Sequence, residues 1–229
     1  MKPSDTITAM KLRSRKTRWI VVILAILLMA VGVAAFRSDE HKHIEYVEKL
    51  GGRVTQKPLL PLGIIPFIPR KMIRFLPMGS VDDIHLGYNK TLTDSNVESV
   101  LSCFSNLRSL NLSFSSITDK SMKAVSSHSK LETLNIRQTE ITNEGVELLS
   151  ASRSLTKVYL NGTKISDDSI AHLSQMKQLK YLKISFTTVT DKSVDILCKM
   201  PNLVTVDVRE TRISEDGKRR LSKINGILN

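Results

Sequence analysis

From Leu107 onward, apolar residues return at positions 1, 4, 6, 11, 16 and 19 of a unit that is 24 residues long. Further units begin at Leu131, Leu155, Leu179 and Leu203, and an irregular earlier unit with two extra residues begins at Val81. Positions 4 and 6 alternate with polar neighbours, which predicts a short strand with one buried face. Positions 16 and 19 follow a pair such as Thr-Asp, which predicts a short helix with a polar cap.

A single unit of this kind cannot bury its own apolar face, so neighbouring units must stack. The pattern therefore predicts an α/β fold, a leucine-rich repeat solenoid of about six units over residues 81–229, with one parallel strand and one short helix per unit. The last unit departs from the pattern as a cap would, because Lys218 and Arg220 replace apolar residues. Four apolar side chains near the end of the chain are expected to cover the preceding helix: Leu221, Ile224, Ile227 and Leu228.

Position 9 of the units carries a hydroxyl residue throughout: Ser115, Thr139, Thr163, Thr187 and Thr211. Because a buried polar group needs a partner, these hydroxyls are expected to form a ladder that bonds the backbone of adjacent turns. Position 13 carries Asp119, Asn143, Asp167, Asp191 or Glu215. These side chains are expected to cap the helix starts and to suit the helix dipole.

Residues 19–36 form an uncharged run that is long enough, at about 27 Å as a helix, to span the hydrocarbon core of a bilayer. Six basic residues and one acidic residue precede this run, so the positive-inside rule keeps residues 1–18 in the cytoplasm. We therefore expect a single-pass membrane protein with an extracytoplasmic repeat domain. The alternative is a signal segment that is cleaved to release a secreted protein.

Residues 37–80 join this predicted anchor to the repeats. Ile44, Val47 and Leu50 have helical spacing, and Gly51-Gly52 is expected to end that helix. Four prolines follow within residues 58–69, and residues 69–76 are amphipathic. Two roles remain open for residues 58–78: they cap the first repeat, or they touch the membrane surface.

No catalytic constellation is evident in the sequence, so we expect neither an enzyme nor a cofactor or small-molecule substrate. His41 and His43 lack a third metal ligand nearby, so no metal site is predicted. Cys103 and Cys198 lie four units apart, beyond disulfide reach, and both are expected to be buried or half-buried.

The chain carries a formal net charge of +12, which would suit a nucleic-acid partner. However, residues 1–18 carry +5 and residues 37–80 carry +4, whereas residues 81–229 carry only +3. Most of the excess charge therefore flanks the apolar run, where it can orient an anchor and meet anionic lipid. We expect membrane association through residues 19–36 and no nucleic-acid partner.

The outward side chains of the strands form the candidate binding surface, because parallel strands line the concave side of such solenoids. Exposed aromatic rings flanked by cations suit recognition of a protein or of an envelope glycan. The opposing interpretation is a solvated sheet whose rings fold over neighbouring strands. The predicted binding residues are Tyr88, Phe114, Arg137, Lys157, Tyr159, Tyr181, Lys183, Phe186 and Arg209.

The unit LxxLxLxxTxITDxGVxxLxxxxx resembles leucine-rich repeat proteins of planctomycete-like bacteria. The resemblance extends to the basic tail, the apolar run and the phrase at residues 46–54, YVEKLGGRV. It implies a membrane-anchored module for protein contacts. The repeats are also similar to the cysteine-containing repeats of F-box adaptors, although the chain has no F-box; the alternative function is therefore an F-box-like substrate adaptor in ubiquitin-dependent degradation.

Overall fold

The computed structural model describes residues 40–58, 78–222 and 227–228. The chain divides into two compact units, Met1–Lys42 and His43–Asn229, and the following description concerns the second. The predicted anchor at residues 19–36 and the amphipathic residues 69–76 lie outside the described residues. Within the described ranges, no helix combines the length and the apolar character that crossing a membrane requires.

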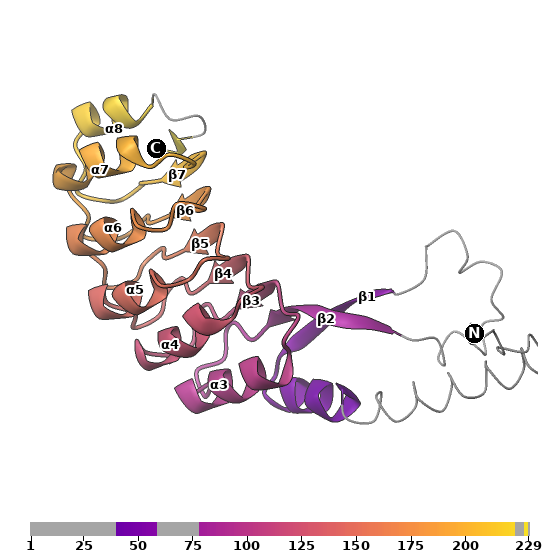
Figure 1. Ribbon diagram of the computed structural model, residues 1–229. Coiled ribbons are helices and arrows are strands. Elements are labelled where there is room, and N and C mark those ends of the chain that lie inside the picture. Colours follow the sequence, from indigo (N-terminus) through magenta and orange to yellow (C-terminus); the bar gives the residue numbers. More distant parts are fainter. Residues whose placement is uncertain (1–39, 59–77, 223–226, 229) are drawn as a thin grey trace, which may run out of the picture. The chain divides into compact units, whose positions relative to one another are not determined.

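The strands form one sheet in which spatial order follows chain order (Figure 1). From β2 onward every neighbouring pair is parallel, as the repeat pattern predicts. The strands are β1 (Arg53–Pro58), β2 (Met78–His85), β3 (Ser109–Asn111), β4 (Thr133–Asn135), β5 (Lys157–Tyr159), β6 (Tyr181–Lys183), β7 (Thr205–Asp207) and β8 (Ile227–Leu228). The predicted α/β solenoid of parallel strands and short helices is thus confirmed.

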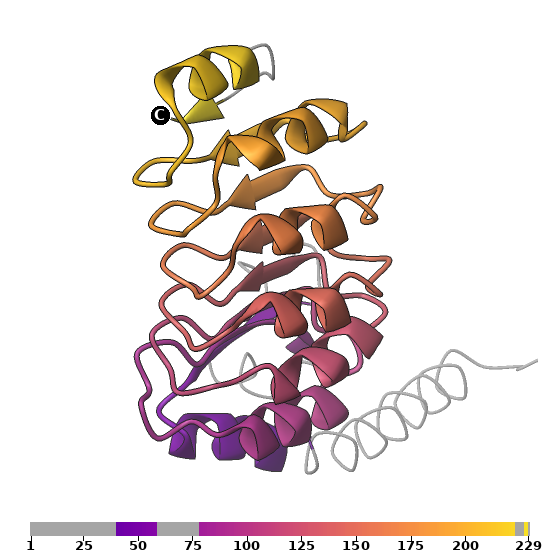
Figure 2. The ribbon, with the colours of Figure 1, turned by 90° about the vertical axis from the view of Figure 1, so that its left-hand side faces the viewer.

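One helical element per unit lies on the opposite side from the strands, and Figure 2 shows these helices stacked in register. The elements are α3 (Asp94–Cys103), α4 (Lys120–Ser127), α5 (Asn143–Leu149), α6 (Asp167–Leu173), α7 (Val194–Lys199) and α8 (Glu215–Leu221), and the short 3-10 helix η2 (Asp191–Ser193) precedes α7.

The core is a set of apolar columns that run from unit to unit. In one column Leu110 pairs with Leu134, then Val158, Leu182 and Val206, and each of these side chains is at most 1% exposed. Each buried side chain of this size contributes about 1.5–3 kcal/mol of transfer free energy. Register between units is therefore fixed, because a slip of one residue would expose a whole column.

The N-terminal end of the sheet contains an element that the sequence did not predict. Residues 53–58 form β1, which pairs antiparallel with β2. The helix at residues 40–49 precedes it, as expected, and Val47 on this helix is fully buried. Gly51 ends the helix with a left-handed φ of 73°, and a Cβ on Gly52 would lie 2.6 Å from Leu86 Cδ2. Both glycines are therefore needed for the sharp return from helix to strand.

The C-terminal end also differs from the prediction. Leu221 is buried, and residues 227–228 form β8, an additional strand that pairs with β7. Ile224 lies outside the described residues. Lys218 pairs with Glu215, and Arg220 pairs with Asp195 of the preceding unit. The last helix thus presents ion pairs to solvent, in agreement with a capping unit.

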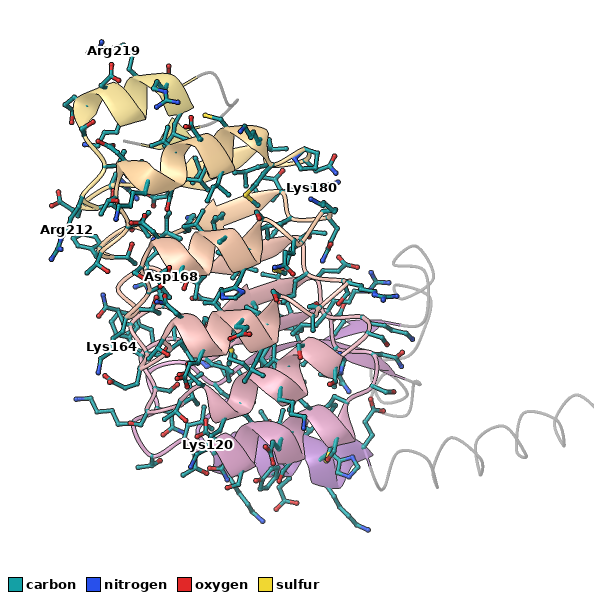
Figure 3. The ribbon with its side chains drawn as sticks, turned by 60° about the vertical axis from the view of Figure 1, so that its left-hand side comes forward. Lys120, Lys164, Asp168, Lys180, Arg212 and Arg219 are labelled. Atoms are coloured by element: carbon teal, nitrogen blue, oxygen red, sulfur yellow. The ribbon has the colours of Figure 1, made fainter. Side chains whose placement is uncertain are left out.

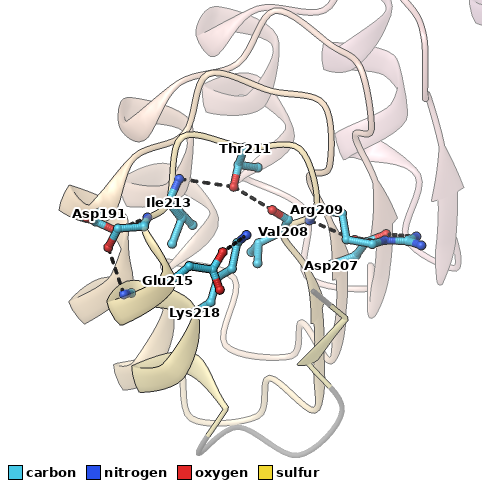
Figure 4. Close-up of polar contacts among 10 residues, drawn as sticks. Asp191, Asp207, Val208, Arg209, Thr211, Ile213, Glu215 and Lys218 are labelled. Atoms are coloured by element: carbon cyan, nitrogen blue, oxygen red, sulfur yellow. Dashed lines mark hydrogen bonds and ion pairs between the residues drawn. The ribbon is translucent and has the colours of Figure 1, made fainter.

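The hydroxyls at position 9 do not bridge adjacent turns as expected. Each donates to the carbonyl oxygen three residues earlier in its own unit, at 2.6 Å, as Thr211 does to Val208 (Figure 4). The same bond is made by Ser115, Thr139, Thr163 and Thr187. The hydroxyls are thus satisfied within their own unit, where they close the turn that follows the strand.

Adjacent units are joined instead by the side chains that were expected to cap helices. The Asp167 carboxylate accepts hydrogen bonds from the Thr190 amide at 2.9 Å, from the Thr190 hydroxyl at 2.7 Å and from the Ser193 hydroxyl. Asp94, Asp119, Asn143 and Asp191 contact the following unit in the same way. We call these five residues the acidic ladder, in which Asn143 is the one neutral member. At helix starts such as those of α5, η2 and α8, the preceding hydroxyl residue caps instead: Thr142, Thr190 and Ser214 each accept from a backbone amide of the first turn.

Position 8 of every unit has a left-handed backbone. Gly162 adopts a φ of 65°, and the equivalent residues of the other units adopt φ between 52° and 63°: Tyr88, Phe114, Gln138, Phe186 and Glu210. A residue other than glycine loses about 1–2 kcal/mol in this conformation. The turn after each strand therefore imposes strain in five of the six units.

Candidate functional site

An open hollow lies on the outward side of the strands, where the chain leaves β3 to β7. It has a volume of about 420 Å³. Its walls combine aromatic, cationic and amide side chains: Phe114, Asn135, Arg137, Gln138, Tyr159, Asn161, Lys183, Ser185, Phe186, Asp207 and Arg209. We call it the strand-face hollow. The lining residues occupy positions 5, 7 and 8 of successive units, so the repeat itself brings them together.

Cations and rings alternate on β5 and β6. Lys157 lies opposite Tyr181, and Tyr159 lies opposite Lys183 in the parallel register. The Lys157 Nζ is 5.2 Å from the ring centroid of Tyr181, and the Lys183 Nζ is 5.1 Å from that of Tyr159. Each contact is worth about 0.5–1 kcal/mol at an exposed site. The pairs hold four long side chains in place and thereby lower the entropy that a ligand would have to remove.

Aromatic rings form a ledge at the end of β2 and β3. The rings of Tyr88 and Phe114 stack with centroids 4.6 Å apart, and the Arg137 guanidinium lies 4.7 Å from the Phe114 centroid. Tyr88 is nevertheless 73% exposed, and Phe186, on the other side of the hollow, is 62% exposed. These rings gain little from burial within the folded chain.

Asp207 is the one carboxylate that lines the hollow, and it is only 1% exposed. Arg209 donates two hydrogen bonds to this carboxylate, from Nε to Oδ1 at 2.9 Å and from Nη2 to Oδ2 at 2.8 Å (Figure 4). Burial raises the pKa of Asp207, but the bonds from Arg209 and the charge of Lys183 outweigh it, so the pKa lies below its usual value. This acid is thus ionised and neutralised by its neighbour.

The structure brings six of the nine predicted binding residues into the hollow: Phe114, Arg137, Tyr159, Lys183, Phe186 and Arg209. Tyr88 lies beside it against Phe114, whereas Lys157 and Tyr181 form their own pair next to it on the sheet. Rings do contact neighbouring strands, as the opposing interpretation held, but Tyr88 and Phe186 remain largely exposed.

Five lining residues were absent from the predicted set: Asn135, Gln138, Asn161, Ser185 and Asp207. Asn135 and Asp207 occupy outward strand positions, but amides and acids lack the aromatic character that marks a binding surface in the sequence. Gln138, Asn161 and Ser185 follow the strands, and alignment of units at positions 7 and 8 would have identified them.

Other candidate chemistry is dispersed. Cys103 and Cys198 are free thiols, and Cys198 is exposed, contrary to the expectation of partial burial. The His43 ring packs edge-on against Phe104, with centroids 6.0 Å apart. Within the described ranges, no three His, Cys, Asp or Glu side chains gather as a metal site would require.

Comparison with known proteins agrees with this architecture. A family model described as leucine-rich repeat matches residues 105–126 and 127–150. Among curated proteins, none matches the chain. Similar solved structures include an internalin (inlF) from Listeria monocytogenes, with 19% identity and a TM-score of 0.47 over 64% of this chain and 47% of the other. Leiomodin-1 actin-binding site 2 is 9% identical, with a TM-score of 0.42 over 62% of this chain and 77% of the other.

This chain thus spans about half the length of the internalin that it matches. The family match rests on two consecutive units, and the geometry of those units continues through the parallel sheet from β2 to β8. The described repeats are a leucine-rich-repeat-like α/β solenoid.

Proposed function

We propose that this chain is a membrane-anchored module that binds a protein partner through the strand-face hollow and the side chains around it, without catalysis of its own. The leucine-rich repeat match is consistent with a protein-binding module. Anchoring is inferred from the uncharged run at residues 19–36 and its basic flank, with the N-terminus in the cytoplasm and the repeats outside it. No observation on the described residues favours the F-box-like alternative.

The exposure of aromatic rings on strained backbone carries the proposal. Tyr88 and Phe186 occupy left-handed positions at which glycine would remove the strain, and they are 73% and 62% exposed. In the folded chain, the backbone strain at these two residues is therefore offset by little burial of their rings. The same turn recurs in every unit, so the strain alone marks no site; Tyr88 and Phe186 differ from the other position-8 residues in their large exposed rings. Rigid aromatic side chains provide large contact area when a partner covers them.

A triple substitution tests the binding surface. Tyr159→Ala, Tyr181→Ala and Lys183→Ala together remove three of the four paired side chains on β5 and β6, so we expect capture of the partner by the full chain to be lost. A matched control changes three exposed residues on the helical side: Lys120→Ala, Leu148→Ala and Asp168→Ala (Figure 3 labels Lys120 and Asp168). Circular dichroism should show both variants folded. Undiminished capture by the first variant would contradict the proposal.

The exposed thiol of Cys198 provides a test of topology. A membrane-impermeant maleimide should label the chain in intact cells, and Cys198→Ser should remove most of that signal because Cys103 is half-buried. Labelling that requires permeabilisation of the cytoplasmic membrane would place the repeats on the cytoplasmic side, against the proposal.

A further inference from the structure

The strand-face hollow has an uncompensated positive charge. Of the three cations that line it, Arg209 is neutralised by the buried Asp207 carboxylate. Within the described residues, no ion pair joins Arg137 or Lys183 to an acid, and both lie over rings. The charge of Lys183 also acts on Asp207, so this single carboxylate is shared by two of the three cations. Some cations elsewhere on the solenoid do pair with acids, as Arg108 does with Glu132 and Lys164 does with Glu140. Three cations and one carboxylate leave the lining with a net positive charge, which favours an anionic group in the hollow.

The hollow also has two apolar walls. Phe114 and Phe186 occupy position 8 of units three apart, and the corresponding positions between them carry Gln138 and Gly162. Three strand spacings separate the walls by about 14 Å. An extended peptide advances about 3.3 Å per residue, so four residues cross that distance.

Side chains of an extended peptide alternate in direction, so residues i, i+2 and i+4 face the same side. A peptide laid across the strands would place i and i+4 on the two phenylalanine walls and i+2 between them, near Arg137 and Lys183. Side-chain amides on the floor, such as that of Asn135, offer hydrogen bonds to a peptide backbone.

We propose that the strand-face hollow binds an extended acidic segment of a partner protein with the pattern apolar, any residue, Asp or Glu, any residue, apolar. This inference rests on the proposed function, because it assumes that the strand face binds protein. It adds the chemical class of the segment: the acid meets Arg137 and Lys183, and the flanking apolar side chains meet Phe114 and Phe186.

Direct binding to the full chain in detergent micelles tests this assignment. The probe is a fluorescein-labelled peptide with the core phenylalanine, serine, glutamate, serine, phenylalanine, followed by fluorescence anisotropy. One comparison peptide has lysine in place of glutamate, and another has the same composition with the two phenylalanines adjacent. We expect the first peptide to bind at least tenfold more tightly than either comparison peptide, and its binding to weaken as salt is raised.

The protein variants separate this site from general charge attraction. Arg137→Gln with Lys183→Gln should weaken binding at least tenfold. Lys180→Gln with Arg212→Gln removes the same charge from residues that do not line the hollow, and Figure 3 places these two at opposite edges of the solenoid. That control should retain affinity within about twofold, because screened charges outside the hollow contribute little.

Each contrary result has a distinct meaning. Equal binding of the lysine peptide, or tighter binding of tripolyphosphate, heparin or phosphatidylglycerol added to the micelles in competition, would overturn the acidic-peptide assignment. Failure of every peptide, combined with loss of partner capture in the Tyr159, Tyr181 and Lys183 variant, would overturn the assignment and leave the proposed function intact. Failure of the peptides with undiminished capture in that variant would overturn both.

Discussion

Asp167 accepts hydrogen bonds from both the backbone amide and the hydroxyl of Thr190, 23 residues further along the chain, at 2.9 and 2.7 Å. The pair belongs to the acidic ladder, which ties each helix start to the next unit. Because a solenoid is stabilised by contacts between neighbouring units, such bonds contribute directly to its cooperativity.

Removal of the Asp167 carboxylate should therefore be costly. Asp167→Ala would leave the fully buried Ser193 hydroxyl and the Thr190 amide without their acceptor, so we expect a loss of about 2 kcal/mol in the free energy of unfolding. Asp167→Asn should cost less than about 1 kcal/mol, because Asn143 makes the equivalent bonds with an amide. Urea unfolding of the full chain in detergent measures both, and equal losses would contradict the ladder.

Acid should weaken the same ladder. Burial raises the pKa values of Asp94 and Asp167, but bonds from the neighbouring hydroxyls and amides, together with Lys120 and Lys192 respectively, lower them below 3.8 overall. A depressed pKa in the folded state stabilises the fold above the unfolded pKa, and that stability is lost as pH falls through the folded value. We therefore expect the midpoint temperature of unfolding to decrease once the pH drops below about 4. The double variant Asp94→Asn, Asp167→Asn should lose less stability on acidification than the unchanged chain. Equal losses in the two proteins would show that these carboxylates are not the cause.

Gly145 occupies the position at which three other units place a serine beneath the ladder: Ser121, Ser169 and Ser193. A Cβ there would lie 2.1 Å from Asp119 Oδ1, so Asp119 must move to admit any side chain. In Gly145→Ser, the hydroxyl can donate to the displaced carboxylate, as Ser121 does to Asp94. We expect Gly145→Ser to be about 1 kcal/mol more stable than Gly145→Ala, because a bond to a carboxylate outweighs the higher helix propensity of alanine. Thermal unfolding should show this order; the reverse order would contradict it.

The strained turns predict opposite effects at two equivalent positions. Gly162→Ala should destabilise by at least about 1 kcal/mol, because φ is 65° and the new Cβ would displace Gln138. Glu210→Gly should stabilise by up to about 1 kcal/mol by relief of strain at a φ of 52°. Glu210→Ala is the control, because it shortens the same side chain without relieving the backbone strain. A comparable gain in stability from alanine would exclude strain as the cause.

The 24-residue repeat period predicts most of the fold. Residues such as Leu110 and Ile117 recur at fixed positions, and periodicity predicts their burial because stacking must hide each apolar face. Strands β1 and β8 could not be predicted in this way, because they lie outside the repeat and their pairing depends on the chain's path. The acidic ladder was misread for a related reason: Asp119 has a plausible local role, whereas its actual partner, Thr142, is 23 residues away.

The site was predictable in outline only. Outward positions on the strands identified Tyr159 and Lys183, whose cross-strand contact follows from register. Asp207 occupies an equivalent position but is buried beneath Arg209, an arrangement that depends on side-chain geometry. The hollow itself arises where small or amide residues interrupt the aromatic ledge, so it emerges only when units are placed side by side.

Photo-crosslinking in living cells tests the central claim most directly. A benzophenone amino acid is placed at Phe186, which lines the hollow, or at Leu148, which is exposed on α5 at the helical side. We predict a discrete crosslinked partner from position 186 that is lost when Tyr159, Tyr181 and Lys183 are replaced, and none from position 148. The same partner captured equally from both positions, or no partner from position 186, would contradict binding through the strand face.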